Sequence, residues 1–136
     1  MGRPGQVVLD THKWIYWVQG DPKLPLFEAE TLKSLRNGGI FVPAICLVEI
    51  AQLHSRGRIQ LELTLSEWFG VALAYPGTEL VPITPAIANE AYSLPGSFHR
   101  DPADRLIVAT ARVLKAELMT DDHLIRGYPH VDIFRG

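Results

Sequence analysis

The sequence predicts an α/β protein, a three-layer α/β/α sandwich with a central, mostly parallel sheet. Two observations lead to this prediction. Short apolar runs that are typical of buried strands, such as Val7-Val8-Leu9, recur along the chain. Longer segments with helical spacing of apolar residues separate them, and such alternation favours a parallel sheet covered by helices on both faces. The length of 136 residues fits one domain over residues 1–136.

The expected elements alternate in chain order. Strands are expected at 6–9, 40–42, 79–83, 117–120 and 131–134. Helices are expected at 12–18, 26–36, 44–55, 64–74, 84–94 and 101–115, with a short turn or helix at 122–126.

Capping and turn residues set these boundaries. Thr11, Thr84 and Asp101 are suited to cap the first turn of a helix, and Pro85 and Pro102 are tolerated inside that turn. Turn-forming residues end other helices, at Gly20-Asp21-Pro22, Asn37-Gly38-Gly39 and Pro76-Gly77.

Composition and charge argue against several classes of protein and of binding site. The net charge of −2 gives no support for binding nucleic acid through bulk charge, although a local basic rim would not show in the total. The single cysteine, Cys46, excludes an internal disulfide and argues against a thiolate zinc site. The N-terminus lacks an apolar signal segment, and no apolar stretch reaches the ~20 residues of a membrane span. We therefore expect a cytoplasmic protein without a membrane partner.

Several acids follow predicted strands. Asp10 ends the first strand, and Asp121 and Asp122 follow the strand at 117–120. The carboxyl ends of parallel strands meet at one edge of the sheet, where open α/β proteins place their sites. Thr11 and Thr120 each lie beside a strand-end acid and could hydrogen-bond water or phosphate, or simply end the element.

Two further acids interrupt apolar helix faces. Glu49 shares a face with Cys46 and Leu53, and Asp104 shares one with Val108 and other apolar residues. Glu49 could equally pack its methylene groups against apolar neighbours while its carboxylate reaches water. An acid in the first turn is also favoured by the helix dipole. That explanation suits Asp101 better than Asp104.

Acids gathered at one edge would repel each other unless a cation lay between them. Oxygen ligands without paired thiolates or histidines favour Mg²⁺ or Mn²⁺ over Zn²⁺. Such an ion can activate a water molecule and offset charge on a phosphodiester. His12 and His99 are expected to be hydrogen-bond partners of acids and not ligands.

Four stretches together resemble the PIN domain, and in particular the VapC-type toxins of bacterial and archaeal toxin–antitoxin pairs. They occur in that family's order and span nearly the whole chain: V-L-D-T-H at 8–12, V-P-A-I-C-L-V-E-I-A-Q-L at 42–53, H-R-D-P-A-D-R-L-I-V-A-T-A at 99–111 and L-M-T-D-D at 118–122.

The resemblance implies an Mg²⁺- or Mn²⁺-dependent endoribonuclease that hydrolyses RNA phosphodiester bonds with a metal-activated water. It places the catalytic and metal-binding quartet at Asp10, Glu49, Asp104 and Asp122, with Asp122 preferred over Asp121. Supporting roles beside the quartet are expected for Thr11, Asp101, Thr120 and Asp121. It also implies a homodimer and a small antitoxin that wraps the toxin and blocks its site.

Two other functions stay open from the sequence. The same fold could be a non-catalytic module that binds RNA or a protein, although a binding module has no need to gather repelling acids. A metal-dependent phosphatase acting on small phosphate esters is a more distant alternative.

Surface features are less decisive. The first helix is crowded with aromatic residues, among them Trp14, Tyr16 and Trp17, which favour an internal core and contact with another chain about equally. Arginines could form a basic rim around the acids, but scattered solvated charge is the favoured interpretation; they are Arg56, Arg58, Arg100 and Arg105. Arg105 and Arg112 are expected on a solvated helix face.

Overall fold

Four parallel strands form one sheet in the order β3-β2-β1-β4. This arrangement comes from a computed structural model that describes residues 5–136. The strands are β1 (Val7–Leu9), β2 (Ile40–Pro43), β3 (Thr78–Val81) and β4 (Glu117–Met119). The first strand thus lies inside the sheet and next to the last one, so two segments far apart in the sequence end side by side.

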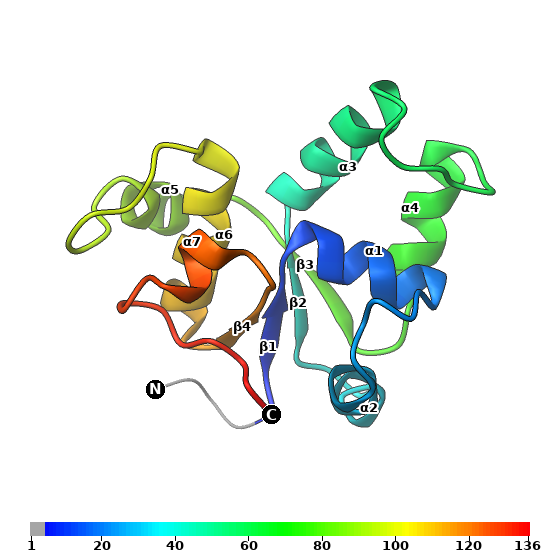
Figure 1. The fold of residues 1–136 in the computed structure, drawn as a ribbon, viewed down its shortest axis with the longest axis horizontal. Helices are drawn as coiled ribbons and strands as arrows, with labels where there is room; N and C mark the ends of the chain where they lie inside the picture. Colours follow the sequence, from blue (N-terminus) through cyan, green and yellow to red (C-terminus); the bar gives the residue numbers. More distant parts are fainter. Residues whose placement is uncertain (1–4) are drawn as a thin grey trace.

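Helices cover both faces of this sheet, which confirms the predicted three-layer sandwich (Figure 1). One layer holds α1 (Thr11–Gln19), α2 (Leu26–Ser34), α3 (Ile45–Ser55) and α4 (Leu65–Leu73). The other holds α5 (Pro85–Ala91), α6 (Pro102–Leu114) and α7 (His123–Arg126). Within residues 5–136, none of these helices has the length and apolar character needed to cross a membrane.

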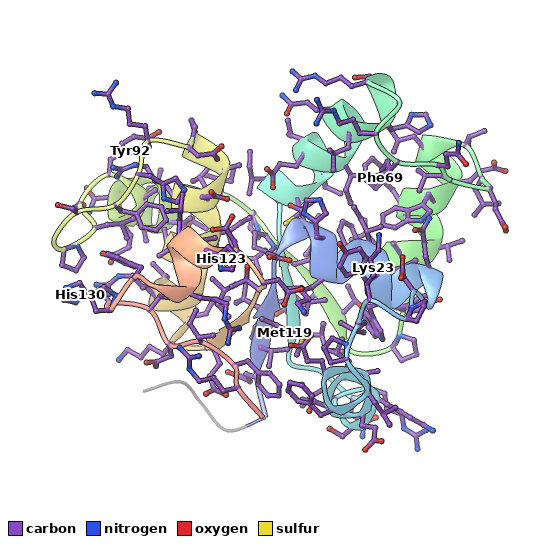
Figure 2. All side chains as sticks on the ribbon, in the orientation of Figure 1. Lys23, Phe69, Tyr92, Met119, His123 and His130 are labelled. Carbon is purple, nitrogen blue, oxygen red and sulfur yellow. The ribbon has the colours of Figure 1, made fainter. Side chains whose placement is uncertain are left out.

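The core lies between the sheet and the two helical layers. The residues of β1 and β2 are buried, as are Leu118 and Met119 of β4, while Glu117 is half-buried. Met119, labelled in Figure 2, lies in the interior of the molecule. Trp14 of α1 is buried and packs edge-on against Trp68 of α4, with ring centroids 5.2 Å apart. At least this part of the aromatic first helix therefore serves the internal core, while Tyr16 and Trp17 stay half-buried.

Two local predictions are wrong. Asp10, and not Thr11, caps α1, because the Asp10 carboxylate accepts a hydrogen bond from the backbone N–H of Lys13. The predicted strand at 131–134 is reduced to one parallel bridge between Leu118 and Ile133. The pairing is made through Leu118, whose N–H donates to the Asp132 carbonyl at 2.8 Å and whose carbonyl accepts from the Phe134 N–H at 2.9 Å.

At the end of the sheet where the parallel strands begin, just before β3, the chain requires a glycine. Gly77 has a φ of +89°, and a Cβ there would lie 2.1 Å from the carbonyl oxygen of Leu35, in the turn after α2. The Gly77 carbonyl accepts a hydrogen bond from the N–H of Ile40, the first residue of β2. The close approach therefore anchors the start of two strands.

Candidate active site

Asp10 lies at the carboxyl end of β1, where the strand order places it beside the end of β4. Leu9 pairs with Met119, and the N–H of Asp10 donates to the Met119 carbonyl at 3.2 Å, so Asp10 lies opposite Thr120. Its carboxylate accepts from the Lys13 N–H at 2.8 Å, and the residue is only 9% exposed. Asp10 is therefore a buried carboxylate that accepts one hydrogen bond from the main chain and another from the side chain of Thr120.

The two adjacent acids after β4 have different partners. Asp122 caps α7 by accepting hydrogen bonds from the backbone N–H groups of Leu124 and Ile125, at 2.9 and 3.1 Å. The N–H of Asp122 donates to the hydroxyl of Thr120 at 3.0 Å. Asp121 instead forms an ion pair with the Nζ of Lys13 at 2.9 Å. The sequence alone does not distinguish these two environments.

The other two acids of the predicted quartet are carried by helices that contact each other, α3 and α6. The hydroxyl of Thr11 donates a hydrogen bond to the carboxylate of Glu49 on α3. On α6, the Oδ2 of Asp104 lies 2.6 Å from the Nε2 of His99, and the Asp104 N–H donates to Asp101, the N-cap of this helix. Each helix-borne carboxylate is therefore held by one side chain from another segment.

The four acids of the quartet line one cavity of about 480 Å³ at the carboxyl edge of the sheet. Thr11, Asp101 and Asp121 also line it, while Thr120 lies buried behind the strand-end acids. Sequence reasoning missed other members of the wall, which are Lys13, Tyr16, Ile107 and Ile125. Nothing in the sequence marks Lys13, because only the fold brings its partners Glu28 and Asp121 to its ammonium.

Burial raises the pKa of three of these acids above the usual values of Asp and Glu. For Asp10 the hydrogen bond from Thr120 opposes the rise only in part. For Glu49 the rise from burial is opposed by Thr11 and reinforced by the negative charge of Asp104. The pKa of Asp104 is likewise raised by burial and by neighbouring acids, against the hydrogen bond to His99. The cavity thus gathers carboxylates that repel one another.

The chemistry of these donors suits a hard cation, although they do not form a closed cage. Throughout residues 5–136, no group of three or more His, Cys, Asp or Glu side chains is placed so that it could already hold a metal ion. Mg²⁺ typically keeps several waters and uses only one or two carboxylates directly. An open wall of oxygen donors that repel one another therefore fits a hydrated Mg²⁺ or Mn²⁺, with Asp10, Glu49, Asp104 and Asp122 as the candidates to hold it.

The prediction that Arg105 lies on a solvated face is wrong. Its guanidinium donates to the backbone carbonyls of Ala91, Phe98 and His99, at 2.9 to 3.0 Å. Arg112 is likewise paired, with Glu90 at 2.6 Å. A guanidinium has five N–H donors, so one residue can hold a loop at several points. Arg105 thereby fixes the segment that presents His99 to Asp104, and it is not available for a basic rim.

The other arginines of the predicted rim, Arg56, Arg58 and Arg100, are exposed and do not line the cavity. Of the two histidines near acids, His99 is a hydrogen-bond partner as expected, and His12 lies exposed at the cavity wall.

Comparison with known proteins identifies the family. The family model of the PIN domain matches residues 7–130, which includes all four motifs and all four acids. This chain belongs to the PIN domain family. The resemblance drawn from the motifs is confirmed, and so is the fold that it implied.

This PIN domain is similar in sequence to a ribonuclease and similar in fold to two solved structures. It is 35% identical over 124 residues to ribonuclease VapC22 of Mycobacterium tuberculosis, covering 91% of this chain and 92% of that protein. Its fold is similar to a chain of the Rickettsia felis VapBC2 complex bound to a promoter DNA fragment, with a TM-score of 0.68, 18% identity and coverage of 94% and 96%. A toxin–antitoxin complex from Klebsiella pneumoniae gives a TM-score of 0.63, with 19% identity and coverage of 93% and 95%.

Proposed function

We propose that this PIN domain is the VapC-type toxin of a toxin–antitoxin pair, an endoribonuclease that hydrolyses RNA phosphodiester bonds with Mg²⁺ or Mn²⁺. One observation carries the proposal. Four acids from four separate segments line one cavity at the carboxyl edge of the sheet, in a chain that is 35% identical to a ribonuclease.

The roles of the residues follow from their positions. Asp10, Glu49, Asp104 and Asp122 would hold the metal, which when bound lowers the pKa of a water molecule and offsets charge on the phosphodiester. Thr11 orients Glu49, His99 orients Asp104, and Thr120 lies behind Asp10 and Asp122. These contacts keep the carboxylates in place when no cation screens their repulsion.

The partners are RNA, a small antitoxin and a second copy of the chain. The antitoxin is supported by the two solved structures with this fold, which are a VapBC2 complex and a toxin–antitoxin complex. We propose that residues 1–136 act as one domain in the cytoplasm, where such an RNA substrate is found.

The decisive experiment replaces one acid while leaving the fold intact. Asp104→Asn keeps the size of the side chain and removes its charge, so Mn²⁺-dependent RNA cleavage should fall to background. Glu79→Gln is the matched control, because Glu79 is exposed on β3 and does not line the cavity. EDTA should abolish cleavage by the unmodified protein, and the products should carry 5′-phosphate and 3′-hydroxyl ends.

Other outcomes would favour the alternatives. Cleavage by Asp104→Asn at the rate of the unmodified protein would contradict the assignment of the site. RNA binding without cleavage and without any stabilisation by Mn²⁺ would indicate a binding module. Hydrolysis of nitrophenyl phosphate without activity on RNA would indicate a phosphatase.

A further inference from the structure

A buried ion pair lies in the wall of the cavity, and none of the four acids takes part in it. The Nζ of Lys13, in the first turn of α1, lies 2.6 Å from the Oε1 of Glu28, in the first turn of α2. The side chains are 1% and 4% exposed. Burying two charges is costly, and a neutral apolar pair of similar volume often serves stability as well or better. The pair therefore calls for a reason other than stability.

Lys13 has a second partner, which lines the cavity beside it. Its Nζ lies 2.9 Å from the Oδ1 of Asp121, whose side chain is 67% exposed. An exposed carboxylate usually gains little from an ion pair, because water competes for both charges. Here the ammonium itself is out of water, so its attraction for Asp121 is screened less. Lys13 thus joins α1, α2 and the loop between β4 and α7.

This loop carries the fourth acid of the proposed site. Asp121 is adjacent to Asp122, and only Thr120 separates them from β4. A second contact also fixes this loop: the Nη1 of Arg126 donates a hydrogen bond to the Thr120 carbonyl at 2.9 Å. The backbone that presents Asp122 to the cavity is therefore fixed from two directions, by Lys13 through Asp121 and by Arg126 through Thr120.

We propose that Lys13, oriented by Glu28, is a positioning residue that holds Asp121 and thereby fixes Asp122 at the metal-binding cavity. The two adjacent acids then have separate roles, since Asp121 ties the loop and Asp122 faces the cation. Lys13 does not contact RNA, because its ammonium is enclosed by the two carboxylates and almost fully buried. This inference rests on the proposed function and assigns a task to residues outside the quartet.

The first test removes the ion pair between Lys13 and Asp121 and leaves the buried pair of Lys13 and Glu28 in place. Asp121→Asn should weaken Mn²⁺ binding, measured by calorimetry, about tenfold, the scale expected when the partner that orients a ligand is lost. Cleavage should fall by a similar factor through kcat, while KM for RNA changes less than twofold. Asp121→Glu keeps the charge and should recover most of the affinity. Glu30→Gln, an exposed acid on the same helix as Glu28, is the matched control and should change neither quantity.

The second test removes the other end of the tie. The double variant Lys13→Met/Glu28→Leu replaces the buried pair with apolar side chains, so that no unpaired charge is left inside. It should weaken Mn²⁺ binding as much as Asp121→Asn does. Adding Asp121→Asn to it should cause no further loss, because both changes break the same contact. If the double variant does not fold, Asp121→Asn and its rescue by Asp121→Glu decide the matter.

Three results would overturn the inference. Unchanged Mn²⁺ affinity in Asp121→Asn, with Asp104→Asn inactive, would refute the tie and leave the proposed function standing. A larger loss in Asp121→Asn than in Asp122→Asn would reverse the two roles. A protein that neither binds Mn²⁺ nor cleaves RNA would refute the proposed function and this inference with it.

Discussion

The acids at the ends of strands and the acids on helices reach the same cavity but are held in different ways. Asp10 and Asp122 accept hydrogen bonds from backbone N–H groups at the start of the helix that follows each strand. Glu49 and Asp104 are held by the side chains of Thr11 and His99. Asp10 also accepts a hydrogen bond from the side chain of Thr120. The strand-end half of the site therefore always includes donors from the main chain, and the helix-borne half depends on single side chains.

This difference predicts which half of the site a single substitution can disturb more easily. Among single substitutions only one to proline deletes a backbone donor, so the hydrogen bond from the Lys13 N–H to Asp10 should survive most changes of side chain around it. In contrast, Glu49 or Asp104 loses the hydrogen bond that orients its carboxylate when one partner side chain is replaced. The following predictions test this contrast, beginning with the largest expected effect.

The largest effect is expected from Asp10→Asn. Losing one carboxylate of the metal site removes several kcal/mol of transition-state stabilisation, which corresponds to a fall in RNA cleavage of about 10³-fold or more. Asparagine is also a good N-cap, so α1 should keep its first turn. Because burial penalises the charged form of Asp10, the free energy of unfolding in EDTA at neutral pH should rise. Urea unfolding measures this rise, and a clear fall would show that the carboxylate serves folding instead.

A smaller effect is expected from Thr11→Val on the helix-borne half. The change removes the hydrogen bond to Glu49, and such bonds to charged groups contribute about 1.5–3 kcal/mol. Cleavage should therefore fall by about tenfold to a hundredfold, without the complete loss expected for Asp10→Asn. Thr11→Ser keeps the hydroxyl and should restore most of the activity. Equal rates for Thr11→Val and the unmodified protein would show that Glu49 does not depend on this side chain.

The smallest effect is expected in the pH dependence of the metal-free protein. The pKa values of Asp10, Glu49 and Asp104 are raised in the folded state, chiefly by burial. The folded state thus binds more protons than the unfolded chain in the interval above the usual carboxyl pKa of about 4. Its stability should fall as the pH rises through that interval. Urea unfolding in EDTA at a series of pH values should show this slope, and Asp10→Asn should make it shallower.

Added Mg²⁺ gives the control for this slope. A cation that binds the ionised acids stabilises the folded state more at higher pH, so the slope should flatten or reverse. An identical slope with and without Mg²⁺ would indicate that the cavity binds no cation.

The sequence predicts the sheet, and it predicts that acids follow its strands, because both depend on local patterns; the structure places these acids along one cavity. The apolar run Val7-Val8-Leu9 forms a buried strand as its composition predicts, and the pairing is parallel as expected, but the order of the strands comes from the structure. Asp10 and Asp122 could be placed at one edge of the sheet from these runs alone. The placement of Glu49 and Asp104 needed the additional observation that each interrupts an apolar face.

The missed features depend on partners far away in the sequence. Lys13 has the sequence of an ordinary polar position on a helix, and only the fold brings Glu28 and Asp121 to its ammonium. Arg105 has the spacing of a solvated residue until the loop before α6 folds back over it. The segment at 131–134 has the composition of a strand, but it pairs with β4 through Leu118 as a single bridge.

The glycine before β3 has a practical consequence for mutational scans. A side chain at Gly77 would meet the carbonyl of Leu35, at the end of the sheet that lies opposite the cavity. In a scan that scores loss of cleavage, position 77 should therefore tolerate as few residues as the four acids do. The two classes can be separated by protein abundance, because substitutions of Gly77 should deplete the folded protein while Asp10→Asn should leave it plentiful.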